Sequence, residues 1–375
     1  MSKTDNLTDF LTDVANAIRG KKGTTAPINP QNFSDEIASI QSGSGTDRLQ
    51  WKCDNVKTLE YEFRNYLGES LDGALMGLDT SNVTSFGSMF YGCAYLTSTP
   101  ILDVSSATTL YEAFRNCYRL THCPISSFGH VPNINYVFCN CNAMKNISTT
   151  DFSGVVSAQS AFEYCRELTD IPERFNFTAC TNMKYTFYSC AKLTSLDVDT
   201  TNAQNMESTF GSCNALETLT ITTTSNAKNC YGVFMSCLKL ITINGEIDLI
   251  NATSVNNIFN NCKELKNITL KNIKMSLQIG SGTSWGHNLS LDSLINAVKE
   301  LWDYSSGTTT YTLTMGSANL AKITNTYVKL ITPTQEQIDA DPYIESKMPC
   351  EVCESTDEGA MLIKDYALLK NWSIN

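Results

Sequence analysis

Hydrophobic residues recur along most of this chain in one repeating pattern. A Phe is followed three residues later by a Cys, and three residues after that by a Leu or a Met. Successive Cys residues of the pattern lie 23 to 25 residues apart. A fixed period of this length is typical of a solenoid, in which each repeat stacks on its neighbours. We expect these Phe and Cys side chains to form a buried ladder, made of Phe90, Cys93, Phe114, Cys117, Phe138, Cys141, Phe162, Cys165, Phe187, Cys190, Phe210, Cys213, Phe234, Cys237, Phe259 and Cys262.

Each repeat contains two hydrophobic periods. Apolar residues occupy the positions seven and four before the Phe, the Phe itself and the Cys, as in Ala203, Met206, Phe210 and Cys213. This spacing predicts a short helix with four side chains on one face. The period then changes to two, as in residues 216–221, which predicts a short strand. The expected fold is therefore an α/β solenoid whose strands stack as a parallel ladder about 4.8 Å apart.

The first forty residues carry a different pattern. Residues 8–19 predict an amphipathic helix, and a second short helix is expected to begin near Pro30. Two helices of this size cannot bury their apolar faces alone, so we expect residues 1–40 to attach to another surface. Residues 41–47 predict a Gly/Ser linker to the solenoid at residues 48–275. The attachment residues are expected to be Phe10, Leu11, Val14, Ile18, Phe33 and Ile37.

The pattern loosens after residue 275, and we expect residues 276–375 to form a C-terminal cap. Ser290 is expected to cap a helix whose apolar face runs from Leu291 to Leu301. Residues 311–315 alternate like a strand, and residues 319–323 start another short helix. A polar insert near residues 327–359 could contact another protein or be a simple surface loop. We favour the loop.

The composition narrows the possible functions. A formal net charge of −11 and a pI of about 4.8 argue against binding to nucleic acid or to anionic membranes. No apolar run is long enough to cross a bilayer, so we expect no membrane insertion. The chain starts without the apolar segment of a secretion signal. We therefore expect synthesis in a reducing cytoplasm, where the 15 Cys remain thiols.

Candidate chemistry is sparse. The Cys ladder, always three residues after a buried Phe, is interpreted as small side chains filling a narrow space rather than as a metal or redox site. Cys350 and Cys353 form a lone CxxC pair without the second pair or the His that a zinc site needs, so they are weak metal candidates. No nucleophile, metalloprotease or phosphate-loop motif occurs. We expect no catalytic residues, no cofactor and no enzymatic activity.

A binding surface has better support. On each predicted strand the residue eight positions after the Phe should point away from the core. This row is small and polar, which suits contact with carbohydrate or with a flat protein surface, and equally suits plain solubility. The candidate ligand face consists of Ser98, His122, Asn146, Asp170, Ser195, Thr218, Thr242 and Asn267.

Tyrosines form a second candidate surface beside the predicted helix-to-strand turns. Their amphipathic rings could serve recognition, although packing between successive repeats would also explain them. They are Tyr91, Tyr95, Tyr118, Tyr164 and Tyr188.

Two stretches resemble known families. The repeated Phe-x-x-Cys-x-x-Leu core, with the lead-in of residues 79–83, resembles the BspA-like leucine-rich repeat. Residues 13–23, followed by residues 28–37, resemble an N-terminal segment of bacteriophage virion proteins, especially those of tails, baseplates and fibres.

These resemblances imply a phage virion structural protein. Its N-terminal segment would bind other virion proteins, and its repeats would face a glycan or protein of the host cell surface. It would be made in the host cytoplasm and end in a tail, a baseplate or another surface appendage. The virion context implies a homo-oligomer, with a trimer favoured. The alternatives are a purely architectural or decoration protein that contacts only virion proteins, and a cellular BspA-like surface adhesin.

Overall fold

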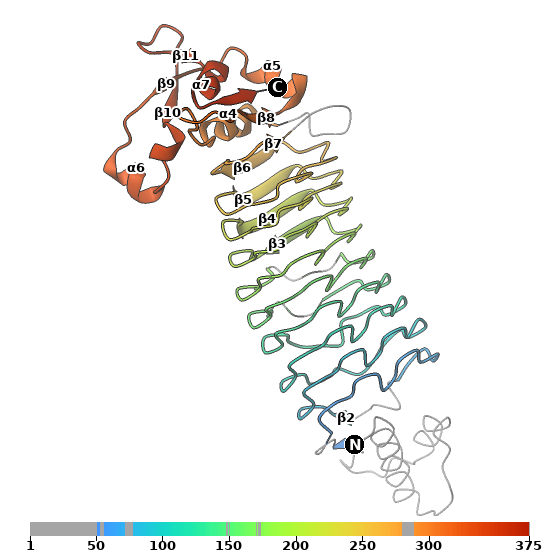
Figure 1. Cartoon of the computed structure of the whole chain (residues 1–375). Helices are drawn as coiled ribbons and strands as arrows, with labels where there is room; N and C mark the ends of the chain where they lie inside the picture. The colour runs from blue at the N-terminus through green and yellow to red at the C-terminus, as the bar shows by residue number, and fades with distance from the viewer. Residues whose placement is uncertain are drawn as a thin grey trace, which may run out of the picture.

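The chain winds into a parallel β-solenoid that ends in a compact cap (Figure 1). The computed structural model describes residues 51–52, 56–71, 78–147, 149, 151–169, 171, 174–279 and 289–374. The predicted helices of residues 1–40 and the linker at residues 41–47 lie outside the described residues, so both stay predictions. The predicted solenoid is confirmed.

In the later coils one side of each coil is a strand, and these strands stack in parallel. β3 (Ser195–Val198), β4 (Thr218–Thr223), β5 (Thr242–Asp248) and β6 (Asn267–Lys271) form a four-stranded sheet in chain order. The sheet appears where apolar residues alternate with polar ones, because the apolar side chains turn inward and the polar ones outward. The predicted parallel ladder is confirmed for these coils.

On the same side of the earlier coils, the strand pairing is limited to short pairs and single bridges. β1 (Trp51–Lys52) pairs in parallel with β2 (Leu78–Asp79), and the following coils are joined by isolated bridges. Pro100 and Pro124 occupy the strand position that Asp197 takes in β3. Proline has no N–H to donate to a neighbouring strand, which explains why regular strands do not form there.

The opposite side of each coil is not helical, and the prediction of a helix there is wrong. In the described repeats this segment, from four residues before the Phe to three after it, is a series of turns; we call it the turn segment. Ser208 and Ser212, on either side of Phe210, have left-handed φ angles of 50° and 60°. Thr209 N–H bonds within its own coil to the Met206 carbonyl, whereas Phe210 N–H bonds across to the Val233 carbonyl of the next coil.

The reason is geometric. Strands stack about 4.8 Å apart, whereas an α-helix with its side chains is about 10 Å wide, so straight stacking leaves no room for one helix per coil. The turn segment instead shares its backbone hydrogen bonds with the neighbouring coil. This segment and the three residues before it still direct the four predicted apolar positions inward, as Ala203, Met206, Phe210 and Cys213 are all fully buried.

A second ladder of parallel bridges runs along the start of the turn segments, five residues before each Phe. Its side chains are all Ser, Thr or Asn, and most accept a hydrogen bond from the N–H two residues later, as Asn205 does from Glu207 at 3.2 Å. This bond turns the chain into the turn segment. The ladder consists of Thr58, Ser85, Thr109, Asn133, Ser157, Asn182, Asn205, Asn229 and Ser254.

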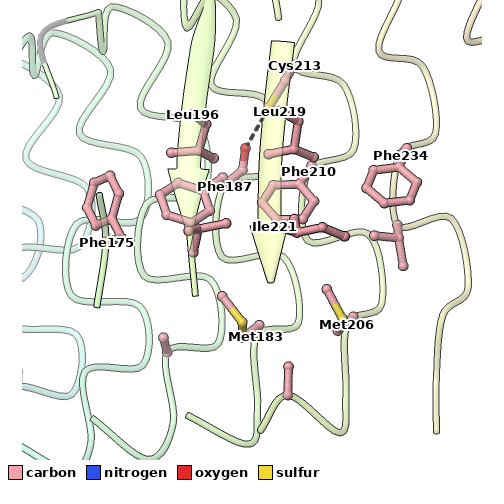
Figure 2. Packing of buried hydrophobic residues seen from close by; sticks show 14 of the residues in the cluster. Phe175, Met183, Phe187, Leu196, Met206, Phe210, Cys213, Leu219, Ile221 and Phe234 are labelled. Atoms are coloured by element: carbon pink, nitrogen blue, oxygen red, sulfur yellow. Dashed lines mark hydrogen bonds between the residues drawn. The ribbon is translucent and has the colours of Figure 1, made fainter. Parts of the chain in front are cut away.

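The core is a stack of aromatic rings. Figure 2 shows Phe187, Phe210 and Phe234 in a row, one from each of three successive coils. Phe63, which is partly buried, adds one ring before the ladder, and from Phe63 to Phe259 successive rings lie 5.0 to 6.1 Å apart between centroids and are tilted by at most 22°. The ladder Phe and Cys side chains all lie in the interior.

The cap begins with β7 (Leu277–Gln278) and α4 (Leu291–Lys299). Ser290 caps α4 by accepting from the Ser293 N–H at 3.2 Å, which confirms the predicted cap. Leu294 and Val298 are buried as expected, but Leu291 is 44% exposed because Ser293 and Ala297 complete the buried face instead. The predicted strand and second helix are confirmed as β8 (Tyr311–Thr314) and α5 (Gly316–Ile323). β12 (Trp372–Ile374) and β7 both pair in parallel with β8.

The polar insert is folded, so its interpretation as a simple loop is wrong. It contains β9 (Tyr327–Leu330), α6 (Gln335–Ala340), the 3₁₀ turn η3 (Glu345–Lys347) and β10 (Cys350–Cys353). β9 pairs on one side with β10 and on the other with β11 (Met361–Leu362), which leads into α7 (Ile363–Leu369). The strands of this small antiparallel sheet are short and lie in a stretch rich in polar residues, so the sequence did not indicate them.

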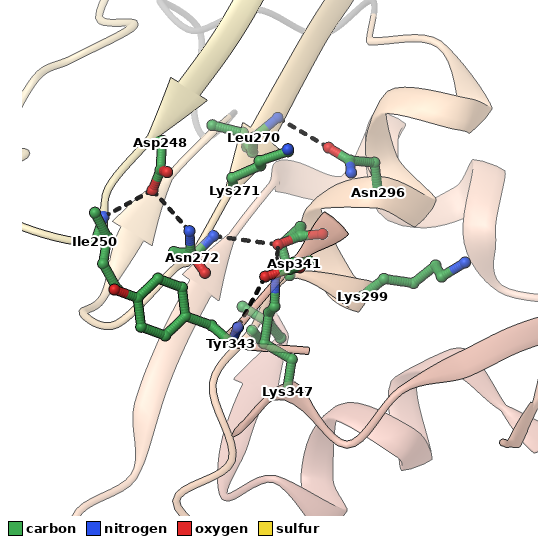
Figure 3. A network of polar contacts seen from close by, with 12 residues as sticks. Asp248, Ile250, Leu270, Lys271, Asn272, Asn296, Lys299, Asp341, Tyr343 and Lys347 are labelled. Carbon is green, nitrogen blue, oxygen red and sulfur yellow. Dashed lines mark hydrogen bonds and ion pairs between the residues drawn. The ribbon is translucent and has the colours of Figure 1, made fainter. Parts of the chain in front are cut away.

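Polar contacts fasten the insert to the last coils (Figure 3). The buried Lys347 ammonium lies 2.6 Å from a Glu300 carboxylate oxygen and 2.5 Å from one of Asp341. The same Glu300 oxygen accepts from the backbone N–H of Asn272, whose amide donates to Asp248 at 2.8 Å. One chain of contacts therefore joins β5, the end of α4 and the insert.

Candidate functional site

The strand side of the solenoid carries the predicted candidate ligand face, which we call the strand face. Ser195, Thr218, Thr242 and Asn267 occupy equivalent positions on β3 to β6, and each pairs directly with the next. Their side chains are exposed or half-buried, and the Asn267 amide donates to the Thr242 hydroxyl at 3.1 Å. The sheet therefore brings this part of the row together on one flat surface.

The rest of the row continues along the earlier coils. His122 pairs with Asn146 through a parallel bridge, and Ser98 pairs with Ser70. His122 is exposed, and its Nδ1 lies 2.6 Å from the Thr121 hydroxyl. Asp170 lies outside the described residues.

A parallel row two residues further along each strand was missed in the sequence. Thr220 and Asn244 lie beside one another, and the Asn244 amide donates to the Thr220 hydroxyl at 3.2 Å. Asp197 precedes them in the row, and its carboxylate lies 3.2 Å from Arg174. The alternation of period two could have identified this row, because every second strand residue faces the same side.

The outer surface of the turn segments forms a second polar and aromatic face. We call it the turn face and define it by Tyr61, Arg64, Tyr91, Tyr111, Glu112, Arg115, Tyr136, Gln159, Tyr164, Lys184, Tyr185, Tyr188, Glu207 and Tyr231. Guanidinium groups lie over tyrosine rings here: Arg64 is 4.7 Å from the Tyr91 centroid, and Arg115 is 4.8 Å from that of Tyr136. Such contacts between charge and ring hold exposed aromatic side chains in place.

Glu207 is an acid of the turn face that three side chains hold in place. It accepts from Tyr185 at 2.9 Å and Asn229 at 3.1 Å, and pairs with Lys184 at 3.1 Å. Burial alone would raise the pKa of Glu207, but the bonds from Lys184 and Tyr185 outweigh it and lower this pKa. Burial, together with the Glu207 carboxylate, raises the pKa of Tyr185 to about 12. This carboxylate is therefore ionised and fixed in direction near pH 7.

Of the tyrosines that the sequence indicated, Tyr91, Tyr164 and Tyr188 lie on the turn face. Tyr164 and Tyr188 pack edge to face at 5.7 Å. Tyr95 and Tyr118 lie beyond the turn segment and are among the more exposed aromatic side chains. The left-handed turns that bring distant tyrosines onto one face leave no simple period in the sequence.

The ladder cysteines are free thiols that face the interior. Each donates to the carbonyl of the ladder Phe in the preceding coil, as Cys213 does to Phe187 at 3.1 Å (Figure 2). Burial raises the pKa of the Cys213 thiol to about 12, so the reactive thiolate is scarce near pH 7.

The CxxC pair lies on β10. Cys350 is buried, Cys353 is half-exposed, and both are free thiols. Across the described ranges of the chain, no three His, Cys, Asp or Glu side chains gather into a group that could hold a metal ion. Among the helices that the structure describes, none has the length and apolar character to cross a membrane.

The stacked coils and their polar strand face define a repeat solenoid of the leucine-rich-repeat class. The chain belongs to the family described as "Mycoplasma protein of unknown function, DUF285", whose pattern matches residues 33–150, 57–174, 108–223 and 159–273. No curated protein matches the sequence.

Six solved chains are similar, among them the following three, which have low TM-scores. A leucine-rich cell surface protein from Faecalibacterium prausnitzii is 17% identical over 56% of this chain and 77% of its own, with a TM-score of 0.24. An internalin from Listeria monocytogenes is 12% identical over 83% and 85%, with a TM-score of 0.31. A leucine-rich-repeat protein from Bacteroides ovatus is 17% identical over 52% and 71%, with a TM-score of 0.20.

Proposed function

We propose that this chain is a non-enzymatic recognition protein of a bacteriophage virion. The N-terminal segment would attach it to other virion proteins, and the solenoid would present its strand face to a glycan or protein on the host cell. The observation that carries the proposal is the direct pairing of Ser195, Thr218, Thr242 and Asn267 on four successive strands.

Physical reasoning favours recognition by this face. The coils are hydrogen-bonded to each other on both the strand side and the turn side, so the face is held rigid before binding. A rigid surface loses little conformational entropy when a ligand binds. Its hydroxyl and amide groups can both donate and accept hydrogen bonds, which suits a polar partner.

The virion setting rests on the resemblance of residues 13–23 and 28–37 to phage attachment segments. Attachment to a symmetric particle favours a homo-oligomer, with a trimer as the proposed state. Deleting residues 1–45 should abolish incorporation into particles while the repeats remain folded. Normal incorporation of the truncated protein would contradict the proposed attachment role.

The recognition role can be tested with one substitution and a matched control. Fluorescently labelled full-length protein would be titrated onto a panel of intact bacterial cells and followed by flow cytometry. Thr218→Lys places a long charged side chain in the middle of the strand face and should weaken binding to the recognised strain at least tenfold. Gln204→Lys adds the same charge at an exposed position away from that face and should change binding less than twofold.

Equal effects of the two substitutions would contradict recognition by the strand face. Absence of binding to every strain, together with normal incorporation into particles, would instead favour the purely architectural function.

A further inference from the structure

We propose a separate binding site for a neutral oligosaccharide at Tyr231, where the turn face meets the cap. It goes beyond the proposed function, because it lies away from the strand face and does not depend on attachment to a virion. Tyr231 lines two shallow hollows, of about 520 and 450 Å³. Both volumes lie in the range of about 300–1,000 Å³ that is usual for ligand sites.

The first hollow lies along the turn face. Besides Tyr231 it is lined by Glu207, Asn229, Thr253 and Ser254. Asn229 and Ser254 pair as neighbours in the second ladder of bridges, so successive coils fix their spacing.

The second hollow lies between the last coils and the cap. Asn256 and Asn257 line it from the turn segment, while Gln278 and Thr314 line it from the cap sheet. Gln278 pairs with Thr314, and their inward neighbours Leu277 and Leu313 pair and are buried. The alternation of the two strands therefore turns amide and hydroxyl groups outward, beside the ring of Tyr231.

The ring of Tyr231 is held ready for contact. It is 38% exposed, and its hydroxyl accepts from the Asn257 amide at 3.1 Å. On its other side Asn229 is fixed, because its amide donates to Glu207 and its oxygen accepts from the Tyr231 N–H.

Unused hydrogen-bonding groups surround this ring. The side chains of Ser254, Asn256, Gln278 and Thr314 make no hydrogen bond to the described part of the chain. Together they offer hydroxyl and amide groups that both donate and accept. A ligand with many hydroxyl groups can use all four.

The side chains that line the two hollows favour a sugar over other classes of ligand. An exposed aromatic ring can pack against the C–H face of a pyranose, while the surrounding amides and hydroxyls bind its hydroxyl groups. Among the described residues of the two linings, Leu277 is the one aliphatic side chain, which disfavours an apolar ligand or the apolar core of a protein interface. Glu207 is the one charged side chain among the described lining residues and is already paired with Lys184, which favours a neutral ligand.

The test is calorimetric titration of the full-length protein with maltohexaose, laminarihexaose, xylohexaose and chitohexaose. At least one should bind, and Tyr231→Ala should weaken that binding at least tenfold. Tyr231→Phe keeps the ring and should stay within threefold of the unchanged protein. Gln278→Ala removes one hydrogen-bonding group at an exposed position and should weaken binding about threefold to tenfold.

Two controls separate this site from the rest of the solenoid surface. Tyr118→Ala removes a ring that is 44% exposed elsewhere on the solenoid and should leave the affinity unchanged. Thr218→Lys on the strand face should also leave it unchanged, so the two proposals can fail separately. Thermal unfolding of each variant establishes whether it is folded. If Tyr231→Ala is unfolded, the effect of Gln278→Ala decides the test.

No binding of any of the four sugars at millimolar concentration would overturn the proposal. So would sugar binding that survives both Tyr231→Ala and Gln278→Ala.

Discussion

At the scale of single residues, each ladder cysteine has two roles: its small side chain fills a buried space, and its thiol donates a hydrogen bond. Their spacing indicates small buried side chains, and the structure adds a hydrogen bond from each thiol to the preceding coil. These bonds run from 2.9 to 3.3 Å between Sγ and the Phe carbonyl oxygen. Cysteine is small, mainly apolar and a weak donor, so it fills this narrow space and supplies the bond with little cost of desolvation.

Cys213→Ala tests this double role. The substitution removes the sulfur from a fully buried position and leaves the Phe187 carbonyl without its thiol donor. We expect a loss of about 1–2 kcal/mol in the free energy of unfolding, from the cavity and the lost bond. Urea unfolding followed by circular dichroism measures it.

Cys353→Ala is the matched control, because Cys353 is a half-exposed thiol outside the ladder. Its effect should stay within about 0.5 kcal/mol, as for surface substitutions generally. An equal loss in both variants would show that the ladder position has no special role.

At the scale of elements, periodicity identifies which side chains face inward but not how the backbone carries them there. Ala203, Met206, Phe210 and Cys213 have the spacing of a helix face, and all four are buried. The same spacing arises from a turn segment with left-handed residues on both sides of Phe210. Single-sequence patterns cannot separate the two, because the difference lies in whether N–H groups bond within a coil or to the next coil.

The two candidate binding sites also differ in how far the sequence could predict them. The row from Ser195 to Asn267 could be placed from the sequence, because strand residues alternate between two faces. The site at Tyr231 could not, because it joins Tyr231 to residues of the cap that lie more than forty positions away in the chain. Its polar side chains are ordinary surface residues until the fold brings them together.

Gly245 provides an element-scale prediction about the register of the sheet. It lies in β5 with a φ of +96°, where the pairing of β5 with β4 and β6 shifts register. A Cβ there would come within 2.0 Å of the Ile221 carbonyl oxygen on β4. Gly245→Ala should therefore lower the free energy of unfolding by about 2–3 kcal/mol, through backbone strain and displacement of β4.

Gly359→Ala is the control that separates the steric clash of an added Cβ from the backbone strain of a positive φ. Gly359 also has a positive φ, of +78°, but an added Cβ would meet nothing within 4 Å. Its cost should be about 1 kcal/mol, from the left-handed conformation alone. Hydrogen exchange should also show faster exchange at β4 and β5 only in Gly245→Ala. Similar stabilities and exchange rates for the two variants would exclude a special role for the β4–β5 contact.

At the scale of the whole molecule, each coil contacts mainly its neighbours, so the last coil needs a cover for its apolar edge. The cap supplies it, and the buried ion pairs of Lys347 fasten the insert to the same place. The end of the chain closes the cap: the Lys370 ammonium donates to the carbonyls of Lys299 and Leu301, at 3.1 and 2.9 Å, where α4 ends.

Lys370 should make the stability of this closure depend on pH. Its side chain is fully buried, with its ammonium 4.1 Å from the centroid of the Tyr366 ring. Burial lowers the pKa of Lys370 to about 7, although Cys350, Glu300 and Asp303 act to raise it and Lys347 acts with burial. An unfolded Lys keeps a pKa of about 10.4. Between these values the unfolded chain binds one more proton than the folded one, so the free energy of unfolding rises with pH.

The comparison of the unchanged protein with Lys370→Met isolates this effect from the ladder thiols, because they are common to both proteins and cancel. The difference in free energy of unfolding should be constant below about pH 7. Above it, the unchanged protein should gain about 1.4 kcal/mol per pH unit relative to the variant, up to about pH 10. Urea unfolding at pH 6, 7, 8 and 9 measures the slope, with Lys364→Met as a control at an exposed Lys of α7. A flat difference across this range would show that Lys370 is charged in the folded protein throughout, and that the carbonyls at the end of α4 hold an ammonium rather than a neutral amine.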